Sequence, residues 1–155
     1  MIWFYRVLAI LFLSVGGLFV CYISSASGPP ALYVNGVRTI GGDFSWNTPR
    51  GTRVTEPIDL TRIAYGEENT ITASMGDAIK LRNKLPWLGA RQQVQITLYE
   101  VGTRNCYASW PLASRPAISK GYADPGSYCM DIYVVYRSLF VSGSAHYGAV
   151  LNVEE

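Results

Sequence analysis

Residues 124–137 read DPGSYCMDIYVVYR. Pro125 and Gly126 predict a type II turn, because proline presets φ at its second position and glycine supplies the positive φ of its third. The residues that follow are mostly β-branched or aromatic and predict a strand. Alternation places an apolar set on one face: Tyr128, Met130, Ile132, Val134 and Tyr136. The opposite face is apolar in its middle and polar at Asp131 and Arg137. We therefore expect a central strand that is partly covered on both sides.

Cys129 opens this strand, and Cys106 is the other cysteine that lies outside the apolar N-terminal segment. An even number of cysteines in an exported domain is typical of a disulfide, so we expect a Cys106–Cys129 bond. The chain-entropy model gives a closed loop of this size about 3 kcal/mol. A pair of buried thiols is the alternative. No redox activity is expected, because the close Cys-x-x-Cys spacing is absent.

The rest of the chain after residue 30 consists of short alternating runs separated by turn residues. In ALYVNGVRTI, residues 31–40, Asn35-Gly36 is a strong hairpin signal for a type I′ turn. QQVQITLYEV, residues 92–101, alternates apolar and polar residues as a strand with one wet face does. About seven to nine short strands predict an all-β domain, an antiparallel β-sandwich of immunoglobulin-like architecture.

The string DPGSYC resembles the strand F signature of immunoglobulin domains. In that signature the tyrosine stands two residues before the cysteine and on the same face. Here Tyr128 is adjacent to Cys129, so the two side chains point to opposite faces. We therefore keep the immunoglobulin-like architecture as the expectation and not the family.

The first 26 residues have the plan of a secretory signal: Arg6, then seventeen uncharged residues, then small ones. Cleavage after Ala26 is one expectation. The alternative is an uncleaved membrane anchor that contacts the bilayer through residues 2–23, since its length approaches the roughly 17–25 residues of a membrane span. Both readings export residues 27–155 as one domain to the periplasm, the cell surface or the medium.

Composition and motifs argue against several classes of function. Without residues 1–26 the chain has twelve basic and eleven acidic residues, a net charge of +1, so we expect no nucleic-acid partner. His146 is the one histidine, so we expect neither a metal site nor a cofactor. No G-x-S-x-G motif accompanies His146. We expect no catalytic residues, and the alternative is a small exported hydrolase that uses His146.

Aromatic residues in expected loops and strand ends are the remaining functional signal. The candidates for contact with a partner are Trp46, Trp87, Trp110 and Tyr65. Such side chains either close the open ends of a sandwich or form contact surfaces for proteins and glycans. We therefore expect a non-enzymatic binding or structural domain: a pilus or adhesion component, an accessory subunit of an envelope assembly, or a protein inhibitor. Its partner would be another protein, further copies of itself, or a glycan.

Overall fold

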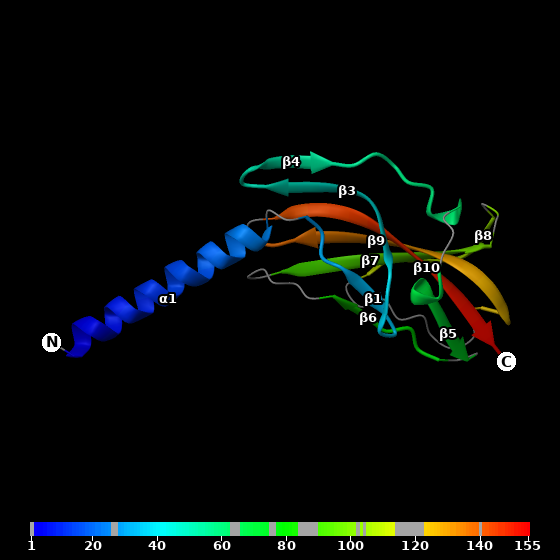
Figure 1. Ribbon diagram of the computed structural model, residues 1–155, viewed down its shortest axis with the longest axis horizontal. Coiled ribbons are helices and arrows are strands. Elements are labelled where there is room, and N and C mark those ends of the chain that lie inside the picture. Colours follow the sequence, from blue (N-terminus) through cyan, green and yellow to red (C-terminus); the bar gives the residue numbers. More distant parts are fainter. Residues whose placement is uncertain are drawn as a thin grey trace.

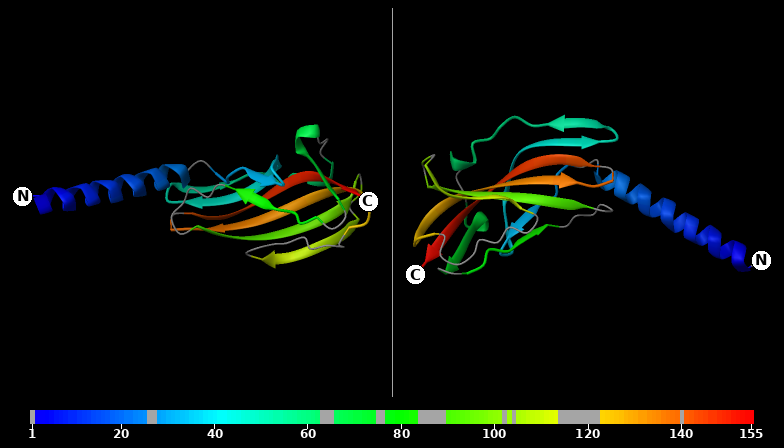
Figure 2. Two further views of the ribbon diagram at one scale, coloured as in Figure 1. Left: turned by 90° about the horizontal axis from the view of Figure 1, so that it is seen from below. Right: turned by 180° about the vertical axis from the view of Figure 1, so that it is seen from behind.

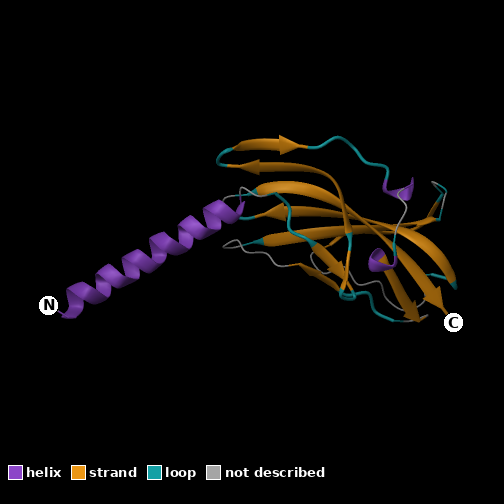
Figure 3. Ribbon diagram, in the orientation of Figure 1, coloured by secondary structure: helices purple, strands orange, loops and turns teal. Residues whose placement is uncertain are grey.

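The computed structural model describes residues 2–25, 28–62, 66–74, 77–83, 90–101, 103, 105–113, 123–139 and 141–155. One helix, α1 (Ile2–Ser25), precedes a domain built of strands (Figures 1 and 3). The strands are β1 (Leu32–Val34), β2 (Val37–Arg38), β3 (Ile40–Thr48), β4 (Gly51–Val54), β5 (Thr70–Ser74), β6 (Leu81–Asn83), β7 (Arg91–Glu100), β8 (Cys106–Ala113), β9 (Gly126–Arg137) and β10 (Ser142–Glu154). Two short 3₁₀ turns are η1 (Leu60–Arg62) and η2 (Glu67–Asn69).

The strands form two sheets. The large sheet has the order β4-β3-β10-β9-β7-β8, all antiparallel, and β5 pairs in parallel with β10. The small sheet has the order β2-β1-β6. The β9–β10 hairpin lies at the centre of the large sheet, with Ile132 opposite Tyr147 and Val134 opposite Ala145. The expected central strand over residues 127–137 is therefore confirmed.

One hydrophobic core joins the two sheets. Alternate residues of β7, β9 and β10 point into it, as do residues of β1, β3 and β5. The fully buried large side chains are Trp46, Tyr136, Leu32, Ile71, Ile96, Leu98, Met130, Ile132, Leu151, Val34, Val94 and Val134. The all-β expectation is confirmed, with two sheets and one N-terminal helix. The finer immunoglobulin-like sandwich assignment is not confirmed.

The two predicted turns have different outcomes. Asn35 and Gly36 have φ values of 49° and 88°, the positive values that a type I′ hairpin turn requires, and they join β1 to β2. At the second turn Gly126 has φ 158° and already belongs to β9. A type II turn needs about +80° there, so that prediction is wrong. The carbonyl of Asp124 instead accepts a hydrogen bond from the Tyr128 hydroxyl, at 2.9 Å.

The predicted disulfide is also wrong, because strand β7 separates the two cysteines. Cys106 on β8 and Cys129 on β9 are both opposite Tyr99 of β7, one on each side of it. Two strand spacings put their Cα atoms about 9.5 Å apart. A disulfide cannot bridge more than about 7 Å. Both cysteines are thiols, Cys106 exposed and Cys129 buried.

Helix α1 is apolar and is not covered by the domain. Its segment Trp3–Val20 is long and apolar enough to cross a membrane, and none of it is buried. A signal sequence near an N-terminus has the same properties. The expected N-terminal apolar segment is thus present as a helix, and both of its readings, signal and anchor, remain open.

The chain enters the domain at a fixed point. The hydroxyl of Tyr147 donates to the carbonyl of Pro30 at 2.7 Å, and it lies 2.9 Å from the hydroxyl of Tyr136 in the core. Asn83 of β6 donates to Tyr136 at 3.5 Å. Since a buried polar group is costly without a partner, this chain of hydrogen bonds fixes the segment after α1 to both sheets.

Candidate functional site on the outer face of the large sheet

His146 lies on the face of the large sheet that points away from the small sheet. We call this the outer face; it carries Tyr99, Asp131, Tyr133 and His146. The alternation of β10 places His146 there, because its neighbours Ala145 and Tyr147 are both buried in the core. The side chain of His146 keeps 33% of its surface exposed. It is therefore anchored in the sheet and still open to a ligand.

Asp131 of β9 is the partner of His146. Its Oδ1 lies 3.0 Å from Nδ1 of the imidazole. Directly opposite Asp131 on β10 stands Gly148, which has no side chain, so the carboxylate can extend diagonally toward His146. The ring of Tyr133, directly opposite His146, lies 4.7 Å from the imidazole between ring centroids. These contacts fix one orientation of the ring.

A bulge in β3 brings a second carboxylate to the histidine. The β3–β10 register shifts between Ala145 and Tyr147, so that Gly42 and Asp43 together lie across from His146. A Cβ atom at Gly42 would lie 3.2 Å from both the His146 carbonyl and the Leu60 side chain. A side chain at Gly42 would therefore be in tight contact with His146 and Leu60, and the bulge turns Asp43 to the outer face.

The segment that leaves β4 crosses the outer face and supplies a third carboxylate. Leu60 of η1 is 5% exposed and fastens the segment to the sheet. Asp59 accepts hydrogen bonds from the amide and the hydroxyl of Thr61, at 3.2 and 2.6 Å. The Cys129 thiol lies 3.8 Å from the Thr61 carbonyl. The Cys129 thiol thus contacts η1 and does not form a disulfide.

A cavity of about 520 Å³ lies between this segment and the sheet. Its described lining is Asp43, Pro57, Ile58, Asp59, Leu60, Thr61, Tyr99, Asp131 and His146. Three of these residues are carboxylates, and none of them is lysine or arginine. We call this space the His146 cavity. Its charge is negative and its walls combine carboxylates with a phenol and apolar groups.

The pKa shifts of two residues in the cavity agree with its negative charge. The hydrogen bond to Asp131 raises the pKa of His146 above its ordinary 6.5; burial opposes this, and the charges of Asp131 and Asp43 support it. Burial raises the pKa of the Tyr99 phenol, and Asp131 and Asp59 act in the same direction. The carboxylates thus favour the protonated imidazole of His146 and, together with burial, disfavour the ionised phenol of Tyr99.

The cavity contains some of the groups that a hydrolase needs. The His146–Asp131 pair has the geometry of a general base with its orienting acid. Within the described lining the one aliphatic hydroxyl belongs to Thr61, and it donates to Asp59 instead of His146. Among the described residues no group of three or more His, Cys, Asp and Glu side chains could hold a metal ion.

The aromatic candidates lie elsewhere. Trp46 is 0% exposed and packs edge-on against Tyr136 at 5.4 Å, so its inclusion among contact residues is corrected: it belongs to the core. Trp110 is partly buried against the core. Trp87 and Tyr65 lie outside the described residues. The sequence points to His146 but not to the carboxylates that line the same cavity, Asp43, Asp59 and Asp131; the polar position of Asp131 is the one signal for them.

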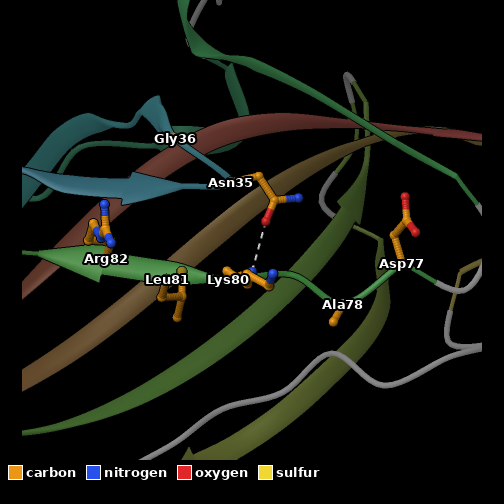
Figure 4. Close-up of a pocket in the computed structure, with 7 residues that line it drawn as sticks. All are labelled: Asn35, Gly36, Asp77, Ala78, Lys80, Leu81 and Arg82. Atoms are coloured by element: carbon orange, nitrogen blue, oxygen red, sulfur yellow. Dashed lines mark hydrogen bonds between the residues drawn. The ribbon is translucent and has the colours of Figure 1, made fainter.

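A larger cavity, of about 700 Å³, lies beside the β1–β2 turn (Figure 4). Asn35 and Gly36 line it on one side, and Asp77, Lys80 and Arg82 on the other. The side-chain oxygen of Asn35 accepts the amide of Lys80 at 2.8 Å, which fastens the hairpin to β6. Its charges have both signs and do not converge, so this cavity is a weaker candidate than the His146 cavity.

No family model, curated protein or solved structure matches this chain.

Proposed function

We propose that the protein is a non-enzymatic binding domain on the outer side of a membrane, and that the His146 cavity receives a basic side chain of a protein partner. The observation that carries this proposal is that Asp43, Asp59 and Asp131 line one cavity, whose described lining contains no lysine or arginine. The negative charge of the cavity would attract a lysine or arginine head, which would donate hydrogen bonds to the carboxylates of Asp43 and Asp131.

The setting of the domain supports the same class of function. Apolar helix α1 leads directly into the domain, either as an anchor or as a signal that is removed after export. The cavity lies on the face of the large sheet that the small sheet leaves open, so a partner can reach it. An adhesion or pilus component, an accessory subunit of an envelope assembly and a protein inhibitor all belong to this class.

The sandwich description of the fold is part of the proposal. Two sheets that share one core favour it, since sandwich folds bury the inner faces of two sheets against each other. The short small sheet and the parallel β5–β10 pair depart from immunoglobulin-like domains.

An NMR titration of the full-length chain with methylguanidinium tests the binding proposal. Methylguanidinium mimics the head of arginine, and methylurea is a neutral analogue of similar shape. We expect methylguanidinium to shift the ring signals of His146 and Tyr99 and methylurea to leave them in place. Equal shifts with both compounds, or no shift with either, would refute the proposal.

Two variants test whether methylguanidinium binds in the His146 cavity. Asp43→Asn removes one cavity carboxylate without removing a hydrogen bond to a described residue, so methylguanidinium should bind more weakly. Glu154→Gln removes an exposed carboxylate at the far end of β10 and is the matched control. Equal weakening by both variants would point to a general charge effect and would contradict binding in the cavity.

The second candidate is an exported hydrolase in which His146, oriented by Asp131, activates water. Loss of a general base costs an enzyme about 10²-fold or more in rate. A hydrolase would therefore cleave a simple ester such as 4-nitrophenyl acetate and lose that activity in His146→Gln. The binding proposal predicts that wild type and His146→Gln both leave the ester at its background rate.

A further inference from the structure

A pair of arginines lies at the end of the domain nearest α1. Arg91 is the first residue of β7 and Arg137 the last of β9, and the two stand directly opposite each other in the register. Alternation places both on the outer face. Like charges at directly opposite positions destabilise a sheet unless something lies between them to compensate.

No carboxylate compensates this pair. Neither Arg91 nor Arg137 makes an ion pair with a described residue, and both are exposed. A cavity of about 250 Å³ lies between them, with a described lining of Arg91, Gln92, Gln93, Val135 and Arg137. Every polar side chain in that lining can donate hydrogen bonds, and none is acidic. The composition suits an oxyanion, which two guanidinium groups can hold by paired N–H bonds.

The place of this cavity in the molecule indicates the source of the anion. In the views of Figures 1 and 2, α1 ends beside the ends of β3, β9 and β7 that include Arg137 and Arg91. The bond from Tyr147 to the Pro30 carbonyl fixes where the chain enters, so this end of the domain stays next to α1. Leu139, in the turn between β9 and β10, is 66% exposed at the same end.

The two ends of the domain also differ in charge. The opposite end of the large sheet carries exposed acidic residues: Glu100 at the end of β7, Asp124 just before β9, and Glu154 and Glu155 at the end of β10. The domain is thus basic toward the helix and acidic away from it. A negatively charged membrane surface would attract the first end and repel the second.

We propose that Arg91 and Arg137 bind the phosphate of an anionic lipid at the surface of the membrane that α1 enters. The contact orients the domain, with Leu139 toward the bilayer and the acidic end away from it. This inference uses other residues than the His146 cavity and does not depend on what that cavity binds.

The test uses the full-length chain in lipid nanodiscs, either of phosphatidylcholine alone or with phosphatidylglycerol added. We expect phosphatidylglycerol to shift the side-chain Nε–H signals of Arg91 and Arg137. A gadolinium-labelled headgroup should broaden the Leu139 amide signal more in these discs than in discs of phosphatidylcholine alone. High salt should reverse both effects, because the interaction is between charges at a surface.

Two double variants separate this site from net charge. Arg91→Gln with Arg137→Gln should abolish the broadening at Leu139. Arg38→Gln with Arg82→Gln removes the same charge from exposed positions on the small sheet and should preserve it. Equal loss in both double variants, or signals that do not differ between the two lipid compositions, would overturn the proposal. A response to added inorganic phosphate but not to phosphatidylglycerol would show a soluble anion as ligand and would overturn the lipid assignment.

Discussion

His146 is the one histidine of the chain, so its titration is observed without ambiguity. Because its pKa in the folded protein lies above 6.5, the His146–Asp131 pair stabilises the fold fully below that pH. This contribution is lost as the pH rises through the folded pKa. We predict that the free energy of unfolding in urea falls over this range and falls less in His146→Gln.

Asp131→Asn checks the cause of that shift. Since the hydrogen bond to Asp131 is the largest contribution to the raised pKa, the variant should lower the pKa of His146. An NMR titration of the imidazole measures it directly. A pKa that stays where it was would show that Asp131 does not hold the proton on His146.

Gly143 tests the packing of β10 on β3. A Cβ atom there would lie in hard contact with the Ser45 carbonyl and 2.7 Å from the Trp46 ring, both of which are fixed by the sheet and the core. Gly143→Ala should therefore destabilise the protein by about 1–3 kcal/mol. Gly41→Ala on β3 is the control, because nothing lies within 4 Å of its added Cβ. Urea unfolding of both variants makes the comparison, and equal stabilities would contradict the packing.

At the scale of elements, the order β8-β7-β9 decides the state of the cysteines. The full-length chain has three cysteines, and thiol titration after denaturation without reductant should find three thiols. In the native protein Cys106 should react quickly and Cys129 slowly, because Cys106 is exposed and Cys129 is buried. A count of one thiol in the denatured chain would restore the disulfide and contradict this strand order.

The elements that could be predicted from the sequence are those set by local pattern. The alternation after Cys129 and the Asn35-Gly36 turn gave β9 and the β1–β2 hairpin, because periodicity and φ preference act over a few residues. Strand order is different: nothing in the spacing of Cys106 and Cys129 indicates that β7 lies between them. The sequence likewise predicts a loop at Trp46, whereas this residue lies on β3 and faces the core.

The candidate site depends on non-local features for the same reason. His146 meets Asp131 only through the β9–β10 register, and it meets Asp43 only because β3 bulges there. Asp59 arrives on a segment that crosses the outer face, where the Leu60 side chain lies over Gly42 of β3. None of these contacts follows from neighbouring positions in the sequence, so a lone histidine was all that the sequence offered.

At the scale of the whole molecule, the two proposed sites occupy different parts of the domain. Its basic end lies toward α1, its acidic end lies away, and the His146 cavity opens between them on the outer face. Without residues 1–26 the chain has 23 charged residues among 129, about 18%, which is low against the roughly 25% of an average soluble domain. We therefore predict that a partner covers part of the surface, with the His146 cavity as its proposed point of contact.

The most direct measurement of the central claim is the pKa of His146 with and without saturating methylguanidinium. A cation bound beside Asp43, Asp59 and Asp131 repels the imidazolium, so the pKa of His146 should fall when methylguanidinium is bound. Methylurea should leave it unchanged. A pKa that is the same with methylguanidinium as without it would contradict the assignment of this cavity as a binding site for a basic group.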